Sequence, residues 1–114
     1  MSHDMSLWTP SSERIGKATL TAFTKAAVER TGRPLASYDA LHRWSVDDRA
    51  AFWDLVWDFC GVVGEKGERV LIDGEKMPGA AFFPDARLNF AENLLRKTGA
   101  GDAIVFRGED KVEK

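Results

Sequence analysis

The sequence has 114 residues and a mass of 12.7 kDa, which is the size of one domain. It is 44% hydrophobic and 30% charged, as is usual for soluble globular proteins. Sixteen basic residues against 18 acidic ones leave a formal charge of −2, too little to hold a polyanion, so we expect no nucleic-acid partner. The single cysteine excludes an intramolecular disulfide framework, and with only two histidines it excludes the common zinc patterns.

The hydrophobic residues are spread too evenly to form a membrane segment. The longest stretches without a charge are about eight residues, against the ~18 needed to cross a bilayer. The N-terminus, Met1 to Asp4, lacks the basic start and the apolar run of a signal peptide. We therefore expect a cytoplasmic protein with no membrane partner.

The first predicted helix begins near residues 9–13 and ends at Gly32. Thr9 would cap it, Pro10 suits the first helical position, and Glu13 complements the positive end of the helix dipole. Gly32 and the following Pro34 would stop it. Its apolar face is rich in alanine and consists of Ile15, Ala18, Ala22, Phe23, Ala26 and Ala27.

Two further helices are predicted between residues 37 and 67. Ser37 would cap a short helix that turns Leu41 and Trp44 inward, and Ser45 would cap a second one. The second helix would close near Lys66 and Gly67. Because it is apolar around much of its circumference, we expect it to be central and covered on more than one side. Its apolar stripe contains Phe52, Val56, Phe59, Cys60 and Val63, widened by Trp53 and Trp57.

The remainder of the chain contains little regular structure. Residues 70–72 predict a brief strand, and residues 73–88 an irregular stretch whose Phe82 and Phe83 should lie against a surface. Asn89 would cap a helix that ends at Gly99. Residues 103–106 predict a strand followed by a turn.

The predicted fold is mainly α with minor β. The strand at residues 103–106 has only Val112, in a charged tail, as a possible pairing partner, and a lone strand is not stable. The sequence therefore looks cut from something longer. We expect residues 1–99 to form a helical region and residues 100–114 to begin a further domain.

No motif for catalysis, cofactor binding or metal binding is evident. Gly61, Gly64 and Gly67 recur every third residue, but a glutamate follows Gly64 and a glycine follows Lys66, so the phosphate-loop pattern fails. We interpret His42 as a surface residue and Cys60 as a buried, inert thiol. The acidic pairs at residues 47–48 and 109–110 suit a helix start and a turn.

Five sequence segments carry a family resemblance when they are read in order. They are W-T-P-S-S-E-R-I at residues 8–15, Y-D-A-L-H-R-W-S-V-D-D at 38–48, F-W followed by V-W-D-F-C-G-V-V-G at 52–64, M-P-G-A-A-F-F-P-D-A-R-L-N-F-A-E-N-L-L at 77–95, and A-I-V-F-R-G-E-D at 103–110. Together they resemble the N-terminal region of the acetoacetyl-CoA synthetases (acetoacetate–CoA ligases), which are AMP-forming acyl-CoA synthetases. In that family an aromatic pair with Trp often stands at residues 81–83 and Gly at Asp85, departures that concern the packing of this loop.

The resemblance implies a parent enzyme that makes acetoacetyl-CoA, AMP and pyrophosphate from ATP, acetoacetate and CoA, with magnesium assisting. The family's phosphate-binding loop and its catalytic lysine have no counterpart in these 114 residues. No catalytic, cofactor-binding or metal residue therefore carries over. The segment would be a helical N-terminal extension that runs into the first strand of a large α/β adenylating domain, where residues 103–106 would pair with strands beyond Lys114.

We therefore expect a structural cover with no catalysis of its own, whose partner is the remainder of its own polypeptide. Left alone, the segment could self-associate through its unpaired strand and the apolar loop around Phe82. The alternative is a free-standing helical interaction module that binds a partner through an aromatic surface formed by Trp44, Trp53 and Trp57.

Overall fold

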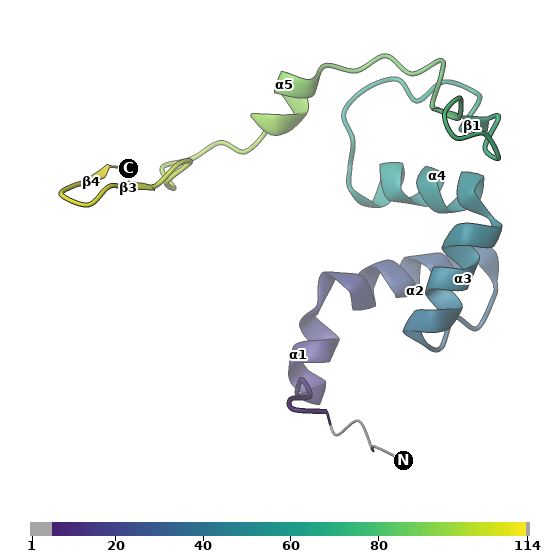
Figure 1. Ribbon diagram of the computed structural model, residues 1–114, viewed down its shortest axis with the longest axis horizontal. Helices are drawn as coiled ribbons and strands as arrows, with labels where there is room; N and C mark the ends of the chain where they lie inside the picture. The colour runs from purple at the N-terminus through teal and green to yellow at the C-terminus, as the bar shows by residue number, and fades with distance from the viewer. Residues whose placement is uncertain (1–5, 114) are drawn as a thin grey trace.

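The computed structural model describes residues 6–113, so residues 1–4, which bear on the absence of a signal peptide, lie outside it. Its fold is mainly α with minor β, as predicted (Figure 1). A bundle of helices comes first, and two short antiparallel hairpins follow with a small helix between them. The elements are α1 (Ser12–Lys17), α2 (Thr19–Thr31), α3 (Tyr38–Asp47), α4 (Arg49–Phe59), β1 (Leu71–Ile72), β2 (Ala81–Phe82), α5 (Phe90–Leu94), β3 (Phe106–Arg107) and β4 (Val112–Glu113).

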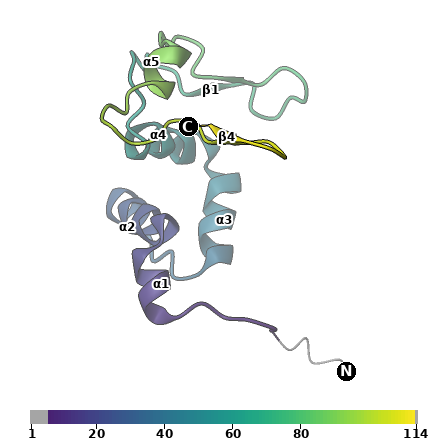
Figure 2. The ribbon, with the colours of Figure 1, turned by 90° about the vertical axis from the view of Figure 1, so that its left-hand side faces the viewer.

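The core lies where α2, α3 and α4 meet. α4 packs on both of the other helices, and the β1–β2 hairpin lies on its opposite side (Figures 1 and 2). The prediction of a central helix covered on more than one side is therefore confirmed. Leu41 and Trp44 point inward as predicted, whereas the sequence pattern missed Leu55 as the buried residue of α4. The buried residues are Phe23, Ala27, Leu35, Leu41, Trp44 and Leu55.

Three predicted helix ends are confirmed because each depends on a local hydrogen bond or backbone angle. The Oγ of Ser37 accepts from the N–H of Ala40 at 3.1 Å, and the Oδ1 of Asn89 accepts from the N–H of Glu92 at 3.1 Å. Gly32 ends α2 with a left-handed φ of 68°, which glycine adopts without steric cost.

The first predicted helix is in fact two helices. Ser11 caps α1, not Thr9, and Ala18 leaves the helical region with ψ at 140°. The Thr21 hydroxyl bridges the break by donating to the carbonyl of Ile15 at 2.5 Å. Alanine is the best helix former, so nothing in the sequence around Ala18 indicated this break.

The boundaries of α4 also differ from the prediction. α3 continues through Ser45 to Asp47, and Asp48 caps α4 by accepting from the N–H of Ala51 at 3.4 Å. α4 then ends at Phe59, because Gly61 turns the chain with a φ of 62°, so the predicted closure at Lys66–Gly67 is wrong. Cys60 and Val63, expected on its buried stripe, are exposed.

The predicted strand at residues 70–72 exists as β1, and its partner β2 lies in the stretch predicted to be irregular. Leu71 stands opposite Phe82, and the two segments meet again at a bridge between Glu65 and Arg87. Gly67 permits this close approach: its φ is 80°, and a Cβ there would lie 2.6 Å from the Cβ of Asp85.

The C-terminal predictions need two corrections. α5 ends at Leu94, short of the predicted Gly99. Of the predicted strand at 103–106, only Phe106 is in a strand, and β3 pairs with β4 inside the chain, with Phe106 opposite Glu113. The strand therefore has a partner within the chain, and its expected pairing with strands beyond Lys114 stays a prediction.

A cluster of four charges joins α2, α4 and the segment after α4. Asp54 and Asp58, one turn apart on α4, both accept from Lys66 Nζ at 2.7 Å. Arg30 on α2 donates to Asp54 at 3.2 Å and to Asp58 at 2.8 Å. Like charges at this spacing repel, so the two cations turn an unfavourable pair into a cross-link.

The cluster moves the pKa values of two of its members. Hydrogen bonds from Lys66 and then Arg30 lower the pKa of the Asp58 carboxyl below 3.8. Partial burial by itself would lower the pKa of Lys66, but its hydrogen bonds to Asp54 and Asp58 outweigh that effect and raise the pKa above 10.5.

We predict that Gly67→Ala weakens the contact between residues 64–69 and 85–88. The added methyl would clash with Asp85 and strain the backbone, at a cost of about 1–3 kcal/mol. Hydrogen exchange at the amides of Glu65 and Arg87, which pair with each other, should become at least about fivefold faster. Gly16→Ala is the control, because no atom lies within 4 Å of the added methyl. Unchanged exchange in the Gly67 variant would contradict the close-approach argument.

We predict that the charge cluster makes stability fall at both pH extremes. Asp58 has a lowered folded pKa, so its contribution is present above pH 3.8 and is lost as the pH falls through the folded value. Lys66 has a raised folded pKa, so its contribution is present below pH 10.5 and is lost as the pH rises through the folded value. Exposed ion pairs contribute about 0.2–1 kcal/mol each, so the effect should be small.

Thermal melts followed by circular dichroism from pH 2 to 6 test the acid side of this prediction. Asp58→Asn should lower the melting temperature near pH 6 and reduce its further fall in acid. Glu68→Gln, which removes an exposed carboxylate outside the cluster, should follow the parent curve. If the two variants behave alike, the cluster does not stabilise the fold.

Candidate functional site

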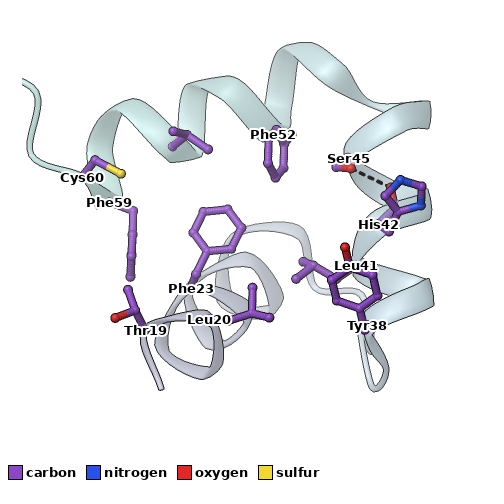
Figure 3. A pocket seen from close by; sticks show the side chains of 11 residues that line it. Thr19, Leu20, Phe23, Tyr38, Leu41, His42, Ser45, Phe52, Phe59 and Cys60 are labelled. Atoms are coloured by element: carbon purple, nitrogen blue, oxygen red, sulfur yellow. Dashed lines mark hydrogen bonds between the residues drawn. The ribbon is translucent and has the colours of Figure 1, made fainter. Parts of the chain in front are cut away.

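An apolar groove of about 390 Å³ lies between α2, α3 and α4 (Figure 3). Its aromatic wall forms because Phe23 of α2 meets two rings of α4 edge-on, Phe52 at 5.7 Å and Phe59 at 5.2 Å between ring centroids. Tyr38, His42 and Ser45 of α3 supply polar groups at one end. A groove of this size and lining suits apolar side chains better than a charged substrate.

The two reactive side chains of this groove do not form a catalytic pair. His42 is exposed, as predicted, and its ring stacks on Tyr38 at 6.2 Å between centroids. Cys60 was expected to be buried, but it is exposed at the opposite end of the groove (Figure 3). Cys60 lies past the last residue of α4, where the early end of that helix turns it out of the core. Phenylalanine rings separate the two groups, so the imidazole is not placed to activate the thiol.

The acidic pairs and the glycine series have structural roles. Asp48 caps α4, and the pair at residues 109–110 lies in the turn between β3 and β4. Lys66, next to Gly67, is held by two aspartates rather than left free for a phosphate. Within residues 6–113 no group of three or more His, Cys, Asp or Glu side chains is arranged to hold a metal ion. In the same residues no helix combines the length and the apolar character required to cross a membrane.

Phe82 and Phe83 pack on α4, which confirms that the loop carrying them lies against a surface. Trp53 meets Phe82 at 5.8 Å and Trp57 meets Phe83 at 4.9 Å between ring centroids. Neighbouring residues of a strand point to opposite faces. Phe83 reaches the same helix face as Phe82 because its φ is 47°, a left-handed conformation that is costly for an aromatic residue.

The loop that carries these phenylalanines is fixed by an ion pair. Arg69 holds the Asp85 carboxylate with two hydrogen bonds of 2.6 and 2.8 Å. Those bonds lower the pKa of Asp85 and raise the pKa of Arg69. The aromatic contact is therefore held from both sides, by the β1–β2 pairing and by this charge pair.

The proposed aromatic surface of Trp44, Trp53 and Trp57 is not formed. Trp44 is only 2% exposed and belongs to the core, where its indole N–H has no hydrogen-bond partner. Trp57 is partly covered by Phe83, and of these three tryptophans only Trp53 is exposed. The spacing of the three tryptophans could not distinguish these surroundings, because each depends on which segment packs on α4.

Sequence reasoning missed Asn93 and Arg96, the residues that attach α5 to the rest of the structure. The Asn93 side chain accepts from the N–H of Val63 at 2.8 Å and donates to the carbonyl of the same residue at 2.9 Å. Arg96 donates to the carbonyls of Gly61 and, at 3.0 Å, Cys60. Only the repetition of asparagine at residues 89 and 93, one helical turn apart, could have indicated a polar attachment face.

A family and several relatives that are described as CoA synthetases match this chain. The family described as acetyl-coenzyme A synthetase N-terminus matches residues 38–94. Acetoacetyl-coenzyme A synthetase of Rhizobium meliloti (strain 1021) is 55% identical over 112 residues, covering 98% of this chain and 17% of the relative. Malonamoyl-CoA synthetase of Penicillium aethiopicum is 36% identical over 91 residues, covering 78% of this chain and 12% of the relative.

A solved structure agrees with these sequence matches. Acetoacetyl-CoA synthetase from Streptomyces lividans superposes with a TM-score of 0.69 and 44% identity, covering 78% of this chain and 14% of that one. The chain thus spans about a sixth of the length of the curated acetoacetyl-CoA synthetases that it matches. The matched family covers α3 to α5, and the chain belongs to this family of acetyl-coenzyme A synthetase N-termini, homologous to the N-terminal region of acetoacetyl-CoA synthetases.

Proposed function

We propose that the chain is the non-catalytic N-terminal cover of an acetoacetate–CoA ligase and packs on its large adenylating domain. The complete enzyme would join acetoacetate to CoA with conversion of ATP to AMP and pyrophosphate, and magnesium would assist. In this proposal ATP, magnesium, acetoacetate and CoA bind to the large domain, and the role of the segment is structural.

The observation that carries the proposal is that the chain is far too open to be a self-contained domain. Its radius of gyration is 19.3 Å, whereas a compact domain of this length has about 13 Å. Its accessible surface is 9879 Å², against about 6,200 Å² for a compact protein of this mass. The excess of about 3,700 Å² lies in the range of large permanent interfaces.

The exposed apolar side chains support the same conclusion. No residue from 88 to 113 is buried, although this stretch contains many large hydrophobic side chains. They are Leu88, Phe90, Leu94, Leu95, Ile104, Val105, Phe106 and Val112. Soluble proteins rarely leave so much apolar surface in contact with water unless it is an interface.

The alternative, a free-standing module that binds through Trp44, Trp53 and Trp57, has less support. Trp44 is buried and Trp57 is partly covered by this chain's own loop. A partner could reach the covered part of the Trp57 ring only by displacing Phe83.

We predict that the 114-residue chain binds neither ATP nor acetoacetate measurably. The phosphate-loop pattern fails in the sequence, and the two reactive side chains of the groove lie apart. Isothermal titration should show no saturable binding tighter than about 1 mM, roughly −4 kcal/mol. A complete acetoacetyl-CoA synthetase titrated under the same conditions is the control. Saturable binding to the isolated chain would contradict a purely structural role.

We also predict that the exposed C-terminal part becomes protected in a complete enzyme. A chimaera would carry this chain in place of the matching 112 residues of the Rhizobium meliloti synthetase. Hydrogen exchange in residues 88–113 should be at least about tenfold slower in the chimaera than in the isolated chain. The amide of Leu41, in the core, should change much less and serves as the internal control. Equal exchange throughout would contradict the cover.

A further inference from the structure

α5 is attached to the structure by its polar side, the reverse of an ordinary surface helix. Asn93 and Arg96 point toward the segment after α4 and bond to its backbone. Asn93 lies inside α5, and Arg96 lies two residues past its last residue, Leu94. A helix that packs on a protein normally turns its apolar side inward.

α5 and its C-cap residue also carry large apolar side chains that face solvent. Phe90 is 78% exposed, Leu94 67% and Leu95 72%. Phe90 and Leu94 are one helical turn apart, and Leu95 follows directly as the C-cap residue. We call these three residues the α5 apolar face. Burying these side chains would be favourable, and that stabilisation is lost while they remain in water.

The attachment fixes the direction of this face. The Asn93 amide makes a two-point contact with both backbone groups of Val63, which resists rotation of α5 about its own axis. Arg96 adds bonds to the carbonyl groups of Cys60 and Gly61, the two residues that directly follow α4. The polar contacts are therefore satisfied within the chain, and the apolar face is presented outward in a defined orientation.

We propose that the α5 apolar face is the docking surface for the large domain of the synthetase and that Asn93 sets its orientation. This inference rests on the cover function proposed above. The occupant follows from two observations: the excess surface matches a large permanent interface, and five sixths of the length of the related synthetases lies outside the matched region. The receiving surface must itself be apolar, because Phe90, Leu94 and Leu95 offer no hydrogen-bonding side chain.

The test compares Leu94→Asp in the isolated chain and in the chimaera with the Rhizobium meliloti synthetase. In the isolated chain the substitution faces water, so the melting curve should be unchanged. In the chimaera a carboxylate would enter an apolar contact, so hydrogen exchange at residues 90–96 should rise at least tenfold toward that of the isolated chain. Leu7→Asp makes the same chemical change at a fully exposed leucine and is the matched control.

Asn93→Ala tests the orientation separately. It removes both bonds to Val63, so the amide of Val63 should exchange faster in the isolated chain while the core amide of Leu41 stays unchanged. In the chimaera, protection of residues 90–96 should fall although the apolar face itself is intact. Unaltered protection there would overturn the orienting role of Asn93.

The outcomes separate this inference from the cover function. If the chimaera protects other surfaces of the chain but not α5, and Leu94→Asp has no effect, the inference is overturned and the cover stands. If nothing becomes protected, the cover itself is wrong. If light scattering shows that the isolated chain dimerises and Leu94→Asp abolishes the dimer while leaving the chimaera unchanged, the occupant is a second copy and the inference is overturned.

Discussion

The aromatic and charged contacts of α4 are what the rest of the structure depends on. On one side Phe52 meets Phe23 of α2 and Trp44 of α3, each at 5.7 Å between ring centroids. On the other side, Trp53 contacts the ring of Phe82 and Trp57 contacts the ring of Phe83. α4 therefore positions α2 and α3 on one side and the β1–β2 hairpin on the other, and shortening or rotating it would separate two layers at once.

Ion pairs also attach α4 to its neighbours, because the apolar core is small. Within residues 6–113 the core has only six buried residues, and one of them, Ala27, has a small side chain. Arg30 and Lys66 add ion pairs to α4 at its edge, where they remain partly hydrated and contribute little individually. Their main effect is geometric, because they fix the path of the chain after α4, and α5 is attached to that segment.

This arrangement places polar contacts inside the chain and apolar surface outside it. Hydrogen bonds from Asn93 and Arg96 to backbone groups define where α5 lies without burying its leucines. An apolar attachment would have buried the surface that we assign to the large domain. A polar attachment leaves that surface available while it keeps its direction, which is the property that a docking surface requires. The open shape and the large exposed area are consistent with an element that completes its folding against a larger partner.

The sequence by itself determined the helical class, the caps at Ser37 and Asn89 and the stop at Gly32, because each of these depends on bonds within one turn of helix. The order of its five motif segments also indicated the family resemblance. Only the tertiary structure decided the break at Ala18, the exposure of Cys60 and the pairing of Phe82 and Phe83 with α4. The aromatic pairing joins residues 29 and 26 positions apart, and hydrophobic periodicity gives no information about which distant segment covers a given face. The polar attachment of α5 was hidden for the same reason, since an asparagine that binds a distant backbone looks in sequence like any exposed asparagine.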